Sequence, residues 1–147
     1  MSIWVCGEVL IDILPTGPVV GGGPANTAKA LARLGYEVDF IDGISTDAYG
    51  ASARKELSRD GVGLGLSLTS DKPTCTATVT LDSKGSASYE FLIDGTATFD
   101  FNLVADCRGR ADKFDRARRH ARGFVFGWHF VSERSWPCSR NLAHGWC

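Results

Sequence analysis

The stretch from Gly21 to Gly35, GGGPANTAKALARLG, constrains the fold most, because it specifies both ends of one helix. Three glycines open a loop, Pro24 suits the first turn of a helix, and the residues up to Leu34 are good helix formers. Gly35 stands where a helix commonly ends in a left-handed residue. Glycine has no Cβ, so this loop lets backbone N–H groups approach a small polar ligand closely. The stretch therefore predicts a turn into a helix that can also form one wall of a binding site.

The segments on either side of this helix predict a layered α/β fold with a mainly parallel sheet. In chain order we expect strands at Ser2–Cys6, Val9–Leu14 and Val38–Ile41, a loop at Pro15–Val20, the helix at Ala25–Leu34, and a second helix at Ala48–Arg59 capped by Asp47 or Thr46. Alternation of strand and helix is typical of this architecture. The segment Val9–Leu14 is largely apolar on both faces, as expected for a strand buried inside such a sheet.

Asp12 is the exception within this apolar strand. A carboxylate in a buried strand is costly unless something binds it. The residue alone leaves two interpretations open, an aspartate that caps the following loop or an aspartate that binds a ligand. Asn26, in the first turn of the glycine-loop helix, offers both a donor and an acceptor to a ligand at that loop.

After the second helix the sequence alternates as a β-hairpin does. Cys75 to Leu81 alternates apolar residues with threonines, Asp82 to Gly85 forms a turn, and Ser88 to Ile93 alternates again. A hairpin inserted at this point does not extend a parallel sheet easily. We therefore expect a separate lid with one apolar face and one face rich in threonine and serine. A lid over a small-molecule site excludes water and completes the pocket.

In their order and spacing these segments resemble the PfkB or ribokinase-type carbohydrate kinases, and within that family the fructokinases. The matching segments are GEVLIDILP (Gly7 to Pro15), GGGPANTAKALARLG (Gly21 to Gly35), FIDGISTDAYG (Phe40 to Gly50) and KPTCTATVTLDSKGSASYEF (Lys72 to Phe91). The resemblance implies an α/β fold, a ribokinase-like three-layer αβα sandwich with a small β-hairpin lid. This chain would hold the N-terminal part at residues 1–101, with the lid strands at about 72–93.

The resemblance also implies a site and a reaction. The substrate would be a sugar, held by Asp12, Gly22, Gly23 and Asn26, with Cys75, Ala77, Phe91 and Ile93 of the lid closing over it. A carboxylate can accept from two adjacent hydroxyls, and an amide both donates and accepts. The reaction would transfer the γ-phosphoryl group of ATP to a sugar hydroxyl, with Mg²⁺ neutralising phosphate charge. Asp47 and Gly50 match a second family segment, where a helix cap and tight packing are expected.

The part of the family that carries catalysis has no counterpart in the sequence. That part holds a glycine-rich segment with an aspartate base beside a helix N-terminus, and no G-x-G-D-like segment occurs here. We therefore expect no catalytic residue and no metal ligand in this chain, and an ATP and Mg²⁺ site that is largely absent from it. The sugar half-site and the lid would remain, and the chain alone would be inactive.

Composition changes sharply where the resemblance ends. The whole chain is 44% hydrophobic, with a net charge of −1, and has no membrane-length apolar run. Residues 1–101 hold seven basic and thirteen acidic residues, whereas residues 102–147 hold nine and four. The leading interpretation of 102–147 is an atypical basic tail translated out of frame. The five irregularly spaced cysteines, without an export signal, favour reduced thiols in a cytoplasmic protein.

Several alternatives compete with these interpretations. The glycine loop could belong to a dinucleotide-binding unit, although Asn26 stands where the third glycine of that fingerprint should be. A P-loop is excluded, since no G-x-x-x-x-G-K-[ST] occurs. The arginines at 116–122 could bind nucleic acid, and Cys138, His144 and Cys147 could bind zinc, but neither set forms a recognised motif, so we expect neither partner. The chain could also be a non-catalytic sugar-binding module or one that forms homodimers through its lid.

Overall fold

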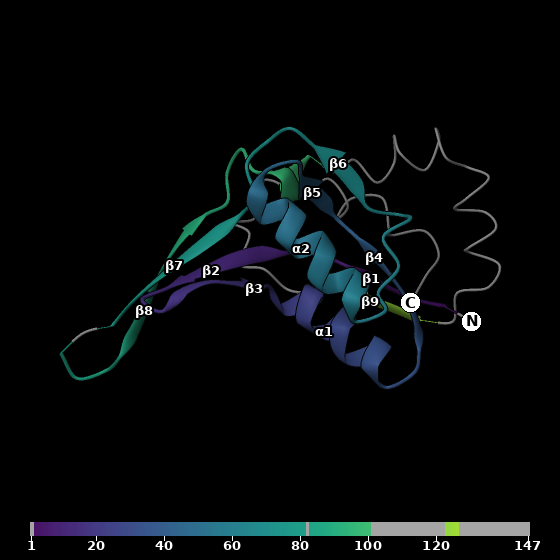
Figure 1. Cartoon of the computed structure of the whole chain (residues 1–147), viewed down its shortest axis with the longest axis horizontal. Helices are drawn as coiled ribbons and strands as arrows, with labels where there is room; N and C mark the ends of the chain where they lie inside the picture. Colours follow the sequence, from purple (N-terminus) through teal and green to yellow (C-terminus); the bar gives the residue numbers. More distant parts are fainter. Residues whose placement is uncertain (1, 82, 101–122, 127–147) are drawn as a thin grey trace, which may run out of the picture.

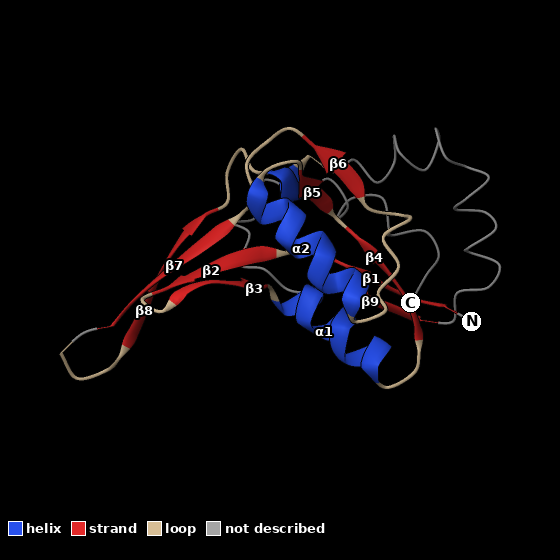
Figure 2. Cartoon of the chain, in the orientation of Figure 1, coloured by secondary structure: helices blue, strands red, loops and turns tan. Residues whose placement is uncertain are grey.

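Figure 1 shows the computed structural model of the chain, which describes residues 2–81, 83–100 and 123–126. The elements in chain order are β1 (Ser2–Cys6), β2 (Leu10–Leu14), β3 (Gly17–Gly21), α1 (Gly23–Arg33), β4 (Glu37–Ile41), β5 (Gly43–Ser45), α2 (Ala48–Arg59), β6 (Leu68–Ser70), β7 (Thr76–Leu81), β8 (Ala87–Leu92), the 3₁₀ turn η1 (Ala97–Phe99) and β9 (Gly123–Phe126). Both helices lie on the same side of a parallel sheet, and a second sheet extends away from it (Figure 2).

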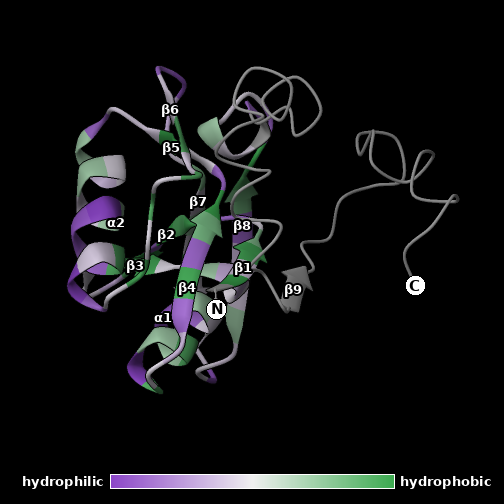
Figure 3. Ribbon diagram, turned by 90° about the vertical axis from the view of Figure 1, so that its right-hand side faces the viewer, coloured by the Kyte–Doolittle hydropathy of each residue, from purple (hydrophilic) through white to green (hydrophobic). Residues whose placement is uncertain are grey.

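The main sheet has the order β4-β1-β9, with β1 parallel to both neighbours. Val5 and Phe40 are fully buried and belong to the core that the helices cover. Trp4 and Ile41 are buried in a second cluster with Leu66. The strand β1 is thus buried on both faces, as is usual in parallel sheets. Figure 3 shows how hydrophilic and hydrophobic residues alternate along β4.

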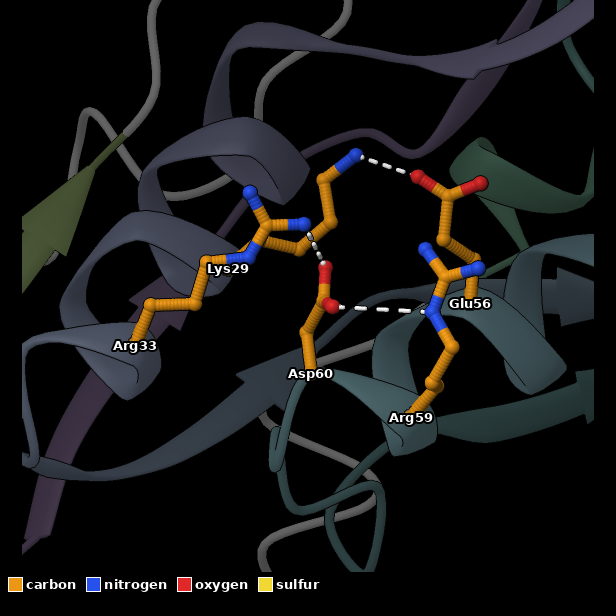
Figure 4. A network of polar contacts seen from close by, with 5 residues as sticks. All are labelled: Lys29, Arg33, Glu56, Arg59 and Asp60. Atoms are coloured by element: carbon orange, nitrogen blue, oxygen red, sulfur yellow. Dashed lines mark hydrogen bonds and ion pairs between the residues drawn. The ribbon is translucent and has the colours of Figure 1, made fainter.

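Small residues let the two helices pack closely on the main sheet, and ion pairs join the helices at their outer side. Ala25, Ala28 and Ala53 are fully buried. In Figure 4, Lys29 Nζ lies 2.7 Å from Glu56 Oε1, and Arg33 Nη2 lies 2.6 Å from Asp60 Oδ2. Lys29 is buried, so this pairing offsets part of the cost of desolvating its charge. Within the described residues, no helix has the length and apolar character needed to cross a membrane.

The second sheet, which we call the lid sheet, has the order β3-β2-β7-β8. It corrects two expectations. The segment Val9–Leu14 does not enter the main sheet, because β2 pairs with β3 and with β7. The segment Pro15–Val20 is not only a loop, because β3 begins at Gly17 after a two-residue turn. Gly7, with φ 142°, lies at the point where the chain leaves the main sheet for the lid sheet. The lid is therefore a four-stranded sheet rather than an isolated hairpin.

Asp47 has the structural role expected of it. Its Oδ1 accepts from the backbone N–H of Gly50 at 2.7 Å and from the hydroxyl of Thr74 at 2.6 Å, and its Oδ2 accepts from the Thr74 N–H at 2.8 Å. A Cβ on Gly50 would lie 2.1 Å from the carbonyl oxygen of Ser45, so only glycine fits there. Asp47 thus caps α2 and ties it to the segment that enters β7.

We expect Asp47→Ala to lower the free energy of unfolding by about 1–2 kcal/mol, since the cap and two further hydrogen bonds are lost. Burial raises the pKa of Asp47, but hydrogen bonds from Thr74, Gly50 and Ser45 outweigh burial and lower it overall. The contribution of Asp47 to the free energy of unfolding is therefore present above the ordinary carboxyl pKa. It is lost as pH falls through the lowered pKa. Urea unfolding across this pH range measures it. Asp47→Asn, which keeps an acceptor oxygen, should lose less; an equal loss would contradict the cap.

Candidate functional site

The strand register brings five of the expected site residues onto one face of the lid sheet. Asp12 pairs with Ala77 of β7, and Ala77 pairs with Phe91 of β8, so these three side chains form a row across the sheet. Cys75 and Ile93 lie two residues along on the same face, packed with Leu10 and Ala77. The opposite face of β7 and β8 carries threonines, serine and Glu90, as expected for a two-sided lid.

Asp12 is half-buried within this apolar row. Among the described residues, no side chain or backbone group forms a hydrogen bond or an ion pair with its carboxylate. Burial raises the pKa of Asp12, because desolvation disfavours the charged form. A desolvated carboxylate is stabilised when hydrogen-bond donors approach it, and hydroxyl groups can supply them. Asp12 is therefore a candidate acceptor for hydrogen bonds from a ligand.

The glycine loop begins directly beside Asp12. A Cβ on Gly21 would lie 2.1 Å from Asp12 Oδ2, so the carboxylate occupies the space that a side chain would need. Gly22, the N-cap of α1, has φ 101°, and its Cβ would lie 2.7 Å from the carbonyl oxygen of Glu8. A Cβ on Gly23 would meet no atom within 4 Å. The structure thus requires glycine at position 22, where a side chain would meet backbone. At position 21 a side chain would displace the Asp12 carboxylate, and at position 23 it would meet nothing.

Asn26 lies in the first turn of α1 with an exposed side chain. Its backbone N–H donates to the carbonyl oxygen of Gly22 at 2.9 Å. Its amide group forms no hydrogen bond with the other described residues and faces solvent. Asn26 is therefore available to a ligand at the helix N-terminus, although no hydrogen bond joins it to Asp12.

Aromatic and aliphatic side chains that the sequence analysis did not single out extend the same face. Tyr89 stacks on Phe91 with ring centroids 6.1 Å apart, and the two residues are 58% and 46% exposed. Val19, on the other side of Asp12, is 49% exposed. The alternation of Tyr89, Phe91 and Ile93 was a usable signal for Tyr89. Val19 had none, since its segment reads as a loop.

Cys75 is a buried apolar residue on this face of the lid sheet and is not a reactive thiol. It is 2% exposed, and burial, together with the charges of Asp42 and Glu8, raises the pKa of its thiol to about 12. A thiol with such a pKa stays protonated and behaves as a small apolar group. Neither Cys6 nor Cys75 is part of a disulfide, and the other three cysteines lie outside the described residues. In the described ranges, no three Asp, Glu, His or Cys side chains gather as metal ligands do.

The fold is a ribokinase-like α/β fold with a lid sheet. The chain matches the pfkB family of carbohydrate kinases over residues 16–109, and it belongs to that family. The predicted family and fold class are therefore confirmed.

Curated relatives include fructokinases from two bacteria. The fructokinase of Klebsiella pneumoniae is 35% identical over 102 residues, which cover 65% of this chain and 33% of the relative. That of Escherichia coli is 34% identical over 103 residues, with the same shares covered. The chain thus spans about a third of the length of these relatives.

Solved structures show the same fold. A fructokinase from Xylella fastidiosa with bound ATP superposes with a TM-score of 0.68 at 24% identity, covering 96% of this chain and 52% of that chain. A putative ribokinase II from E. coli gives a TM-score of 0.72 at 22% identity, covering 85% of this chain and 42% of that one.

Proposed function

We propose that this chain forms the sugar-binding part and the lid of a carbohydrate kinase that transfers the γ-phosphoryl group of ATP to a sugar hydroxyl. The observation that carries the proposal is the desolvated carboxylate of Asp12, which has no partner among the described residues and borders the glycine loop. Membership of the pfkB family supports it. Fructose is the preferred substrate, because the similar curated proteins include fructokinases.

Each candidate residue then has a role in holding the sugar. Asp12 accepts hydrogen bonds from two adjacent hydroxyls, and the amide of Asn26 donates and accepts. Backbone N–H groups at Gly22 and Gly23 approach the sugar where side chains leave room. The apolar row of Cys75, Ala77, Phe91 and Ile93, extended by Tyr89, covers the C–H face of the ring and excludes water.

None of the residues named above is assigned to the phosphoryl transfer step. ATP supplies the phosphoryl group, and Mg²⁺ neutralises charge on its phosphates. The described residues offer no cluster fit to hold the metal, so we derive no step through it. We propose that the catalytic base and most of the ATP site lie in the part of the family fold that this chain does not match, and that the chain alone does not turn over.

Calorimetric titration tests this proposal. Fructose, ribose, NAD and ATP are titrated separately into the purified chain. We expect heat of binding with a sugar and none with NAD, because the carboxylate accepts hydroxyl groups and Asn26 interrupts the dinucleotide fingerprint. Binding of NAD without sugar would overturn the proposal. Phosphorylation of fructose by the chain alone would overturn the part that assigns catalysis elsewhere.

A homodimer formed through the lid is a second candidate. Val19, Tyr89 and Phe91 expose apolar surface on one face of the lid sheet, and within the described residues β8 pairs only with β7. Exposed faces and edges of this kind favour pairing between copies. Multi-angle light scattering over a concentration series distinguishes a dimer from a monomer. Phe91→Ser should dissolve a lid dimer, and an unchanged mass would exclude the lid as its interface.

The change of reading frame between residues 102 and 106 stays a prediction. The family match runs to residue 109, and Gly123–Phe126 forms β9 beside β1. The basic arginine cluster and the possible zinc ligands of 102–147 lie outside the described residues. Sequencing the DNA across codons 95–110 tests the prediction. If the downstream DNA encodes the rest of a sugar kinase in another reading frame, the prediction is supported. If the present reading frame itself continues without interruption into the rest of a sugar kinase, the prediction is refuted.

A further inference from the structure

Asp42 lies buried at the junction between the main sheet and the lid sheet. It directly follows β4 and is 3% exposed. Its Oδ2 accepts from the backbone N–H of Val9 at 2.9 Å and from the hydroxyl of Thr98 at 3.3 Å. The backbone N–H of Gly43 also donates to the carboxylate. A side chain of the main sheet thus holds two separate segments of chain.

Both of these segments connect the main sheet to the lid sheet. Val9 ends the three-residue link from β1 to β2, and Asp12 follows three residues later on β2. The same link is fixed a second time, where the N–H of Gly7 donates to the carbonyl oxygen of Ile41 at 3.2 Å. Thr98 belongs to η1, which follows the last lid strand. One connection that enters the lid sheet and one that leaves it therefore meet at Asp42.

The packing around Gly43 fixes the returning connection closely. A Cβ on Gly43 would lie 2.0 Å from the carbonyl oxygen of Ala97, so η1 rests directly on the backbone of β5. Thr96, just before η1, is fully buried and donates to the carbonyl oxygen of Ile93 at 2.6 Å. Because η1 packs this closely on β5, a shift of η1 would break the hydrogen bond from Thr98 to Asp42.

A carboxylate at this junction is costly. Burial raises the pKa of Asp42 well above its ordinary value, and the charge of Glu8 raises it further, against hydrogen bonds from Val9, Gly43 and Thr98. Glu8 and Cys75 are the titratable groups that face it, and no ion pair with Asp42 occurs in the described part of the chain. Its hydrogen bonds join Val9, Gly43 and Thr98, and their loss would leave buried donors without an acceptor.

We propose that Asp42 is a positioning residue, which fixes the β1–β2 link and η1 to the main sheet and thereby sets where the lid sheet holds Asp12. The effect on sugar binding rests on the proposed function. The effect on the lid connections does not, because it concerns hydrogen bonds within the chain alone.

Hydrogen exchange measured by mass spectrometry tests the proposal on the full chain, with and without fructose. Asp42→Leu keeps the approximate volume and removes the acceptors, Asp42→Asn keeps one acceptor oxygen, and Thr98→Val removes only the bond to η1. For Asp42→Leu we expect exchange in residues 7–14 to rise about tenfold or more, while exchange in α1 and α2 is unchanged. The dissociation constant for fructose should rise by about tenfold, and Asp42→Asn should restore both values to within about threefold of the original.

Unchanged exchange in residues 7–14, or an equal rise throughout the chain, would overturn the proposal. If Asp42→Leu does not fold, Thr98→Val carries the test. We then expect about a threefold rise confined to residues 93–100, with residues 7–14 unchanged because the N–H of Val9 still donates to Asp42. No rise in residues 93–100 would overturn the proposal. If the unmodified chain binds no sugar but the exchange pattern is as expected, the proposed function fails and the positioning role stands.

Discussion

Asp12→Asn should lower the affinity of the chain for fructose by about 100-fold. Hydrogen bonds to a charged group are worth roughly 1.5–3 kcal/mol each, and each 1.4 kcal/mol is tenfold in affinity. The substitution removes the charge and turns one acceptor into a donor, which then faces the hydrogens of the sugar hydroxyls. Calorimetric titration of fructose measures the change.

Glu90→Gln is the matched control for this prediction. Glu90 is an exposed carboxylate on the opposite face of the lid sheet, paired with Thr78. Its substitution should leave fructose affinity unchanged. The pKa of Asp12 is raised in the folded chain, so the free energy of unfolding should fall as pH rises through that pKa. The Asp12→Asn variant should not show this fall. Equal losses of affinity in both variants would contradict the role of Asp12.

Gly21→Ala should weaken fructose binding by at least about tenfold, with little change in the free energy of unfolding, because the group that the Cβ displaces is the end of a half-buried side chain. The added Cβ would lie 2.1 Å from Asp12 Oδ2, so the carboxylate must leave its position. Gly21 is not among the glycines with positive φ, so alanine can adopt its backbone conformation and the effect is steric.

Gly65→Ala is the control for this second prediction, in the connection between α2 and β6, outside the proposed sugar site. A Cβ on Gly65 would meet no atom within 4 Å, and Gly65 is not among the glycines with positive φ. Fructose affinity and the free energy of unfolding should therefore be nearly unchanged. If Gly21→Ala bound fructose as well as Gly65→Ala does, the carboxylate of Asp12 would not hold the sugar from its present position.

Local signals in the sequence predicted the helices and the main strands well. The predicted range Ala48–Arg59 is the observed range of α2, because Asp47 caps it and Gly61, with φ 87°, follows its end. The helix α1 ends before Gly35, which has φ 88° as expected. These helix ends depend on residues that are neighbours in the sequence, so they can be predicted without knowledge of the fold.

The partners of β2 and β3 were not predictable in the same way. Both faces of β2 are apolar, which reads as a strand inside the main sheet. In the structure Ile11 packs against α1 and Val20, whereas Leu10 packs against the lid residue Cys75. The glycines and Pro18 made β3 read as a loop, although proline is tolerated on an edge strand such as this one.

For the site, the family resemblance named Asp12 and the lid residues, and the register of the lid sheet brings them onto one face. Gly21 differs from Gly23 because the Asp12 carboxylate lies beside it in space. A run of three glycines in the sequence does not show which of them has this neighbour. The role proposed for Asp42 likewise depends on hydrogen bonds across 33 and 56 residues of sequence, which no local pattern encodes.

The most direct test of the sugar site is a ¹³C NMR pH titration of the Asp12 carboxyl carbon, with and without saturating fructose. Without sugar, its pKa should lie above the ordinary aspartate value, because burial disfavours the charged form. With fructose, hydroxyl groups that donate to the carboxylate should lower that pKa. A pKa that saturating fructose leaves unchanged would contradict the assignment of Asp12 as the residue that receives the sugar hydroxyls.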